Sequence, residues 1–126
     1  MQQDYARESF AHSEPVPGQR VWDCLRCLDY LESRQDINLG RILGFGEQGV
    51  AITILLSAVI DDQLSSLMLD SIVVTYRSIV EFKSYRLGPA WFLYGILKQF
   101  DLPDPVGALA PRPCWLLNAT NARGKR

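Results

Sequence analysis

The sequence has little of what marks several common kinds of protein. Its only histidine is His12, and its three cysteines, Cys24, Cys27 and Cys114, are an odd number and too few to form a disulfide scaffold. Thirteen basic residues against fourteen acidic ones give a net charge of −1, so no overall field attracts nucleic acid or another polyanion. Positive charge is concentrated only in the basic tail 122–126, which we interpret as a solvated end.

Long hydrophobic segments are also lacking. The longest nearly apolar run, Val50 to Ile60, is shorter than the roughly 20 residues that span a bilayer. The first residues, MQQDYARESF, are polar and do not resemble a signal peptide. We therefore expect no membrane association and take the cytoplasm as the default location. Apolar residues make up 48% of the chain and charged residues 21%, which is typical of a globular domain with one core.

The pattern of apolar residues begins after a polar start. Residues 1–19 contain prolines and predict an irregular lead-in, and 20–121 form the expected domain. At its start, apolar residues recur every three or four positions, which predicts an amphipathic helix over 20–34. Cys24 and Cys27 lie mid-helix beside apolar residues, which favours buried structural cysteines over a redox pair. Without a second Cys/His pair we expect no zinc, and we expect no cofactor.

Strand and helix signals alternate along the domain. The apolar run 41–45 ends in glycines and predicts a strand. In the run 50–60, β-branched residues favour a strand, whereas its length and its place after a glycine turn favour a buried helix, which we predict. Beyond it we expect a strand at 67–75, a loop at 76–88, a helix at 89–100, a break at 101–105, a turn or short helix at 106–109 and a strand at 114–118. This alternation predicts an α/β fold with a parallel sheet.

The turn Gly46-Glu47-Gln48-Gly49-Val50 joins the first predicted strand to the next helix. In a nucleophile elbow, with the pattern G-x-S-x-G, such a turn presents a serine at the top of the sheet, and the next backbone N–H stabilises an oxyanion. The central residue here is Gln48, whose amide cannot be activated as a nucleophile. Glu47 suits an acid or base, but we favour a capping or pairing role at the start of the helix. Taken alone, the turn is more typical of a structural feature.

Longer segments add a family resemblance. Matching positions in the first helix and the strand after it are Arg20, Val21, Asp23, Arg26, Asp29, Tyr30, Leu31, Arg41, Ile42, Gly46 and Gly49. Further matches are Asp101-Leu-Pro-Asp104 and Ala108-Leu-Ala-Pro-Arg-Pro113. Together they resemble the α/β-hydrolase superfamily, in the branch of acetyl xylan esterase-like and dienelactone hydrolase-like proteins. Over 18–121 the resemblance implies the C-terminal half of such a domain, a partial α/β-hydrolase fold with about three parallel strands and flanking helices.

The resemblance implies an ancestral hydrolysis of carboxylic esters, including acetylated carbohydrate, but the catalytic residues do not carry over. In the family a serine, an aspartate and a histidine follow in that order along the chain. The nucleophile position falls on Gln48, and the oxyanion donor after it on Gly49. The nearest candidate for the acid is Asn121, and no histidine follows, because His12 precedes the turn. We therefore predict that this chain has lost the activity.

Two other interpretations stay open. One is a non-catalytic binding or assembly module, in which an exposed sheet edge pairs with a second copy or with a partner chain that completes the sheet. The other is a truncated gene fragment. An ester or carbohydrate ligand is implied by the resemblance alone.

Two further groups have structural interpretations that we favour. The aromatic residues near the helix expected at 89–100 are more typical of core packing than of the wall of an acyl or sugar pocket: Trp91, Phe92, Tyr94 and Phe100. Asp101 and Asp104 lie among prolines, which indicates turns rather than a metal pair.

Overall fold

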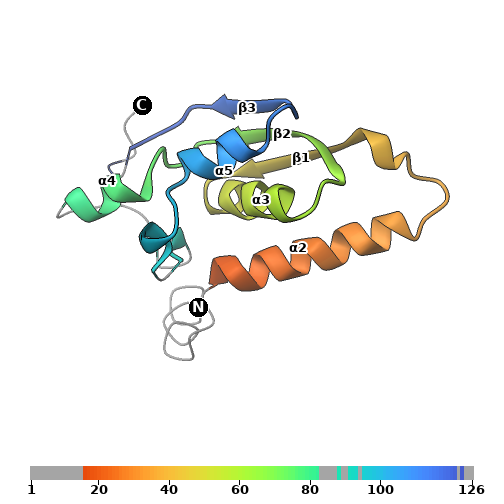
Figure 1. The fold of residues 1–126 in the computed structure, drawn as a ribbon, viewed down its shortest axis with the longest axis horizontal. Coiled ribbons are helices and arrows are strands. Elements are labelled where there is room, and N and C mark those ends of the chain that lie inside the picture. Colours follow the sequence, from red (N-terminus) through yellow and green to blue (C-terminus); the bar gives the residue numbers. More distant parts are fainter. Residues whose placement is uncertain (1–15, 83–87, 89–90, 94, 122, 124–126) are drawn as a thin grey trace.

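The computed structural model describes residues 16–82, 88, 91–93, 95–121 and 123. Figure 1 shows their elements, in which η marks a 3₁₀ helix: α2 (Val16–Glu32), η1 (Leu39–Arg41), β1 (Ile42–Glu47), α3 (Gly49–Ile60), β2 (Leu64–Asp70), α4 (Tyr76–Glu81), η3 (Ile96–Lys98), α5 (Pro103–Ala108) and β3 (Cys114–Leu117). None of the described helices is long and apolar enough to cross a membrane. The first fifteen residues of the expected lead-in, and the tail apart from Arg123, lie outside the described residues.

The three strands form one parallel sheet in the order β1-β2-β3. In its register Phe45 of β1 pairs with Met68 of β2, which pairs in turn with Trp115 of β3. Parallel neighbours need a crossover connection, and α3 supplies it between β1 and β2. The predicted α/β fold with three parallel strands and alternating helices is therefore confirmed.

The core lies between the sheet and α3. Ile52 and Leu55 of α3 are fully buried and belong to the same apolar cluster as Leu67 and Leu69 of β2. Helix α2 packs mainly on α3, so the two helices are stacked against one face of the sheet (Figure 1). The helical prediction for 50–60 is confirmed, because burial on several sides outweighs the strand propensity of its β-branched residues.

Helix α2 begins at Val16, so residues 16–19 are helical and not part of an irregular lead-in as predicted. Pro17 is compatible with this start, because a helix needs no N–H donor in its first turn, and both Val16 and Pro17 are buried. Here burial of two apolar residues outweighs the turn signal that a Pro-Gly pair gives in the sequence.

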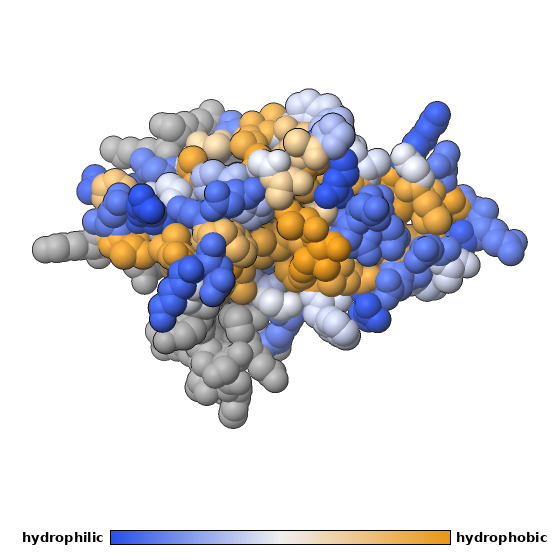
Figure 2. All heavy atoms as spheres, in the orientation of Figure 1, coloured by the Kyte–Doolittle hydropathy of each residue, from blue (hydrophilic) through white to orange (hydrophobic). Residues whose placement is uncertain are grey.

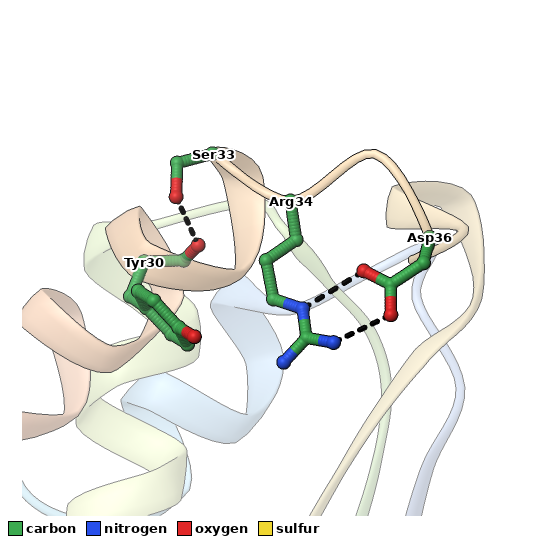
Figure 3. Close-up of polar contacts among 4 residues, drawn as sticks. All are labelled: Tyr30, Ser33, Arg34 and Asp36. Atoms are coloured by element: carbon green, nitrogen blue, oxygen red, sulfur yellow. Dashed lines mark hydrogen bonds and ion pairs between the residues drawn. The ribbon is translucent and has the colours of Figure 1, made fainter.

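The chain turns back after α2 through a short polar segment (Figure 3). The Ser33 hydroxyl donates to the carbonyl of Tyr30 at 2.6 Å, and Arg34 Nε donates to Asp36 Oδ1 at 2.8 Å. A second Arg34 nitrogen pairs with the other Asp36 oxygen, at 2.5 Å. Hydrogen bonding between them lowers the pKa of Asp36 and raises the pKa of Arg34. Because both groups face solvent, this pair orders the turn more than it stabilises the fold.

Strand β2 begins and ends earlier than predicted, at 64–70 instead of 67–75. The polar Ser65 fits into the strand because its hydroxyl donates to the carbonyl of Ile42 at 3.0 Å. The strand stops at Asp70 because Ser71 has a φ of 53°, which is incompatible with an extended backbone. The third strand, Cys114–Leu117, agrees closely with the prediction.

The segment 76–88, predicted as a loop, contains α4, so that prediction is wrong for its first part. Thr75 precedes the helix, and its hydroxyl accepts a hydrogen bond from the N–H of Arg77 at 3.0 Å. This is an N-cap, which stabilises a helix start that the short apolar pattern did not indicate.

The predicted helix over 89–100 is also wrong in its described part, whose named element is the short 3₁₀ helix η3. Gly95 precedes η3 with a φ of 71°, a left-handed conformation that an α-helix does not accommodate. The next helix, α5, begins at Pro103, inside the expected break, because proline suits the first turn of a helix.

Candidate functional site

The turn between β1 and α3 holds Gln48 in a conformation that residues other than glycine seldom adopt, with φ 54° and ψ −125°. Its backbone N–H donates to the carbonyl of Asp70 at 2.9 Å, and its carbonyl accepts from the N–H of Ala51 at 3.0 Å. These hydrogen bonds fix the turn against β2 on one side and α3 on the other. Such a conformation costs on the order of 1–3 kcal/mol, and positions of this kind cluster at functional sites.

Gly46 is required by the close approach of α3 to β1. A Cβ atom there would lie 2.7 Å from Cα of Ala51 and 2.8 Å from the carbonyl oxygen of Val50. At Gly49 a Cβ atom would meet the indole of Trp91 at 3.6 Å, an ordinary contact distance. A residue with positive φ between a strand and a helix, with a glycine two positions before it, agrees with two features of the elbow pattern. The pattern departs at its last position, where Val50 replaces a glycine.

The side chains of this turn face solvent. Glu47 and Gln48 are exposed, and Val50 is about half exposed. The N–H of Gly49 has no acceptor within α3, because Gly49 is the first residue of that helix. The N-cap residue of α3 is Gln48, whose side chain makes no capping hydrogen bond. The side chain of Glu47 makes no hydrogen bond or ion pair with a described residue, so the predicted capping or pairing contact is not found among these residues.

All three strands end in the same way at this edge of the sheet. The residue after each strand has a positive φ: Gln48 at 54°, Ser71 at 53° and Asn118 at 47°. The N–H of Gln48 donates to the last carbonyl of β2, and the N–H of Ser71 donates to the last carbonyl of β3, both at 2.9 Å. Three sharp turns therefore lie side by side at the carboxyl ends of the strands, where ligands bind in open α/β sheets.

Asp70 joins two of these turns through its side chain. Its Oδ1 accepts from the Ser71 hydroxyl and from Nδ2 of Asn118, each at 3.0 Å. Sequence reasoning missed Asp70, Ser71 and Asn118. Two signals in the sequence could have indicated them. One is the polar pair Asp70-Ser71, which ends the apolar run of β2, and the other is Asn118, which directly follows the last strand.

Asn121, the predicted position of the acid, lies beyond this edge. Its Oδ1 accepts from the N–H of Arg123 at 2.9 Å. Pairing continues past β2 and β3, because the N–H of Thr120 donates to the carbonyl of Ile72 at 3.0 Å. The structure therefore brings Asn118, and not Asn121, next to Asp70 at the strand ends. His12 lies outside the described residues.

Trp91 brings an aromatic wall to the turn. Its indole lies beside Gly49, and its carbonyl accepts from the hydroxyl of Tyr76 at 2.7 Å. Burial, and next to it the charge of Asp101, raise the pKa of Tyr76, so its phenol remains a hydrogen-bond donor over the physiological pH range. Trp91 and Phe92 also pack against the apolar core, whereas Tyr94 lies outside the described residues.

Two hollows lie among the described residues. One, of about 310 Å³, is lined by α4, by Phe92 and Leu93, and by residues 95–98. The other, of about 480 Å³, lies between α2, α3 and α5 and includes Val21, Ile60 and Phe100. Figure 2 shows apolar atoms gathered beside α2 on this side of the molecule. The second hollow includes the carboxyl end of α3, so it is remote from the Gln48 turn at the amino end of that helix.

Within the described part of the chain, no cluster of three or more His, Cys, Asp or Glu residues could hold a metal ion. Cys24 is half-buried and Cys27 is exposed, so the prediction that both are buried is wrong for Cys27. The reason is the orientation of α2, which buries Val21 and Leu28 instead. Burial raises the pKa of the Cys114 thiol, which favours its protonated form.

The parallel sheet with alternating helices makes this chain an α/β protein, with polar turns gathered at the carboxyl edge of its sheet. In comparisons with known proteins, no family model, no curated protein and no solved structure matches the chain.

Proposed function

We propose that this chain is a non-hydrolytic protein of the α/β-hydrolase type, related to acetyl xylan esterase-like proteins, which binds an ester-bearing or carbohydrate-like ligand at the Gln48 turn. The single observation that carries the proposal is the backbone of Gln48, at φ 54° and ψ −125° between a parallel strand and a buried helix. In a nucleophile elbow this conformation lifts the central side chain above the sheet. In this chain the same backbone conformation would expose the amide of Gln48 to a ligand above the carboxyl edge of the sheet.

Hydrolysis is not expected from the groups at this edge. The side-chain amide of Gln48 cannot be deprotonated by a neighbouring base to give a nucleophile, as a serine hydroxyl can. No base among the described residues contacts this amide. Asn118 stands at the end of β3, and an asparagine cannot stabilise an imidazolium charge as an aspartate does. The strain is therefore retained without the chemistry that it serves in an esterase.

Binding is supported by the kinds of group that converge there. The side chain of Gln48 offers both a hydrogen-bond donor and an acceptor. The backbone N–H of Gly49, in the first turn of α3, is a further donor that has no acceptor within the helix. The indole of Trp91 adds a flat apolar surface beside Gly49. A neutral ligand with carbonyl and hydroxyl groups, such as an acetylated sugar, matches this mixture of donors, acceptors and an aromatic face.

Catalysis and binding are tested separately. Hydrolysis of p-nitrophenyl acetate is followed with the full chain and with Gln48→Ala, and we expect equal rates. Turnover that depends on Gln48 would sink the non-hydrolytic part of the proposal.

Binding is then measured by titrating an acetylated xylo-oligosaccharide into the ¹⁵N-labelled chain. We expect shifts in the backbone signals of Gln48, Gly49 and Trp91, and a loss of affinity of about tenfold in Gln48→Ala. Gln35→Ala is the matched control, because Gln35 is an exposed glutamine in the turn after α2. Shifts confined to other regions, or equal effects of the two substitutions, would contradict the proposed site.

A further inference from the structure

One face of the parallel sheet is left without a covering layer by the described elements. A Cβ atom on Gly44 would meet the side chain of Ile54 in α3, and one on Gly46 would meet the backbone of α3. Because side chains alternate along a strand, Leu43 and Phe45 must point to the opposite face. They are 51% and 55% exposed, which agrees with a face that no helix covers.

The strand register extends this face across the sheet. Phe45, Met68 and Trp115 are adjacent on the three strands, and parallel partners point to the same side. Leu117 follows Trp115 by two positions on β3 and shares its face. Trp115 is 49% exposed and Leu117 is 40% exposed. We call this surface the open face, and its members are Leu43, Phe45, Met68, Trp115 and Leu117.

An open apolar face is unusual for a parallel sheet. Sheets of this kind occur almost only where both faces are covered, and contiguous apolar patches on soluble proteins mark interaction sites. The stacked helices α2 and α3 are on the other face (Figure 1). We propose that a second copy of this chain covers the open face, so that two sheets pack face to face in a two-fold dimer.

The charges at the ends of β1 favour a second copy and fix its direction. Arg41 is the last residue of η1 and directly precedes β1, whereas Glu47 is the last residue of β1. At roughly 3.3 Å per residue, the six residues of the strand separate the two charges by about 20 Å. Both are exposed, and neither is in an ion pair with any described residue. When the strands of the two copies run antiparallel, Glu47 lies over the partner's Arg41 at both ends of the interface.

The two-fold symmetry also closes the assembly. A two-fold interface uses the same patch on both copies, so it stops at two subunits and does not grow into a fibre. Two sheets that pack in this way lie about 10 Å apart, with the inner side chains interdigitating. This inference is independent of the proposed ligand site, because none of the five residues that define the open face belongs to the Gln48 turn.

The first test is the oligomeric state of the full chain. Sedimentation equilibrium between about 1 and 100 µM should give a dimer, and Phe45→Glu should raise the dissociation constant at least about 100-fold. Ile60→Glu is the matched control, because Ile60 is 66% exposed but lies on α3 and not on the open face. A monomer at every concentration, or open-ended growth, would overturn the proposal, as would equal effects of the two glutamates.

Charge reversal tests the arrangement without touching the apolar residues. Arg41→Glu and Glu47→Arg should each weaken the dimer about tenfold, because each places two like charges opposite each other. The double variant restores opposite charges and should recover the original dissociation constant. Circular dichroism of each variant establishes that it folds. Single reversals that leave the dimer unchanged, or a double variant as weak as the singles, would exclude antiparallel face-to-face packing.

Discussion

The carboxylate of Asp101 accepts a hydrogen bond from the backbone N–H of Tyr76 at 2.7 Å, across a sequence separation of 25 residues. The same carboxylate accepts from the hydroxyl of Thr75 and from the N–H of Leu102 at 2.8 Å. Burial disfavours the charge on Asp101, but these hydrogen bonds outweigh it and lower the pKa of the carboxyl group. Asp101 thus anchors the start of α4, whose Tyr76 holds Trp91 beside the Gln48 turn.

Replacing Asp101 with asparagine should destabilise the protein in a pH-dependent way. At pH 7 we expect a loss of about 1–2 kcal/mol, because a charged acceptor of several hydrogen bonds becomes a neutral one. A carboxyl whose pKa is lower in the folded state stabilises the fold above its unfolded pKa of roughly 4, and this contribution is lost as pH falls through the folded pKa. The difference between the two proteins should therefore shrink as the solution becomes more acid.

Urea unfolding followed by circular dichroism between pH 7 and pH 2 measures this difference. Asp62→Asn serves as the control, because Asp62 is exposed and makes no hydrogen bond with a described residue. A difference between Asp101→Asn and the original protein that stays constant down to pH 2 would contradict the role of the Asp101 charge.

The contact between Asp101 and Tyr76 also illustrates what the sequence could and could not predict. Apolar runs bounded by glycine or proline predicted β1, α3 and β3, because burial of these runs follows from local pattern. The prolines after Asp101 predicted a break in the chain, but Pro103 and Pro105 lie in α5. The partners of Asp101 in the structure are distant in sequence, and α4 depends on them. The same reason explains why Asn118 was missed, since its approach to Asp70 depends on the order of the strands.

Arg112 provides a second long-range tie, at the other end of α3. Its guanidinium donates to the carbonyls of Ala58 at 2.5 Å, Leu64 at 3.0 Å and Asp61 at 3.3 Å. Arg112→Met should cost about 1–3 kcal/mol, because it leaves partly buried carbonyls at the helix end without a donor. Arg112→Lys should recover only part of the loss, since one ammonium cannot span three acceptors in a fixed fork.

The measurement is the midpoint and slope of urea unfolding, with Arg77→Met as the control for loss of an exposed arginine. Equal stability of the two methionine variants would show that Arg112 does not hold the helix end.

Gly46→Ala should be among the more damaging single-methyl additions to this chain. The new Cβ would lie 2.7 Å from Cα of Ala51, and neither backbone can move away without separating α3 from β1. We expect a loss of about 2–4 kcal/mol. Gly107→Ala is the matched substitution in α5, where a Cβ atom meets nothing within 4 Å, and it should be neutral or stabilising by about 0.5–1 kcal/mol. Thermal unfolding of the two variants should therefore shift in opposite directions or differ by several degrees.

Gln48→Gly should stabilise the fold and weaken ligand binding at once. Glycine adopts a φ of 54° without the penalty that a side chain brings, and we expect a net gain of about 1 kcal/mol after the entropy of glycine in the unfolded chain is counted. Gln48→Val should lose stability, because a β-branched residue tolerates this backbone least. Urea unfolding gives the stabilities, and titration with the acetylated oligosaccharide gives the affinities. A glycine variant less stable than the original protein would mean that the turn stores no strain, and then the conformation of Gln48 would be no sign of function.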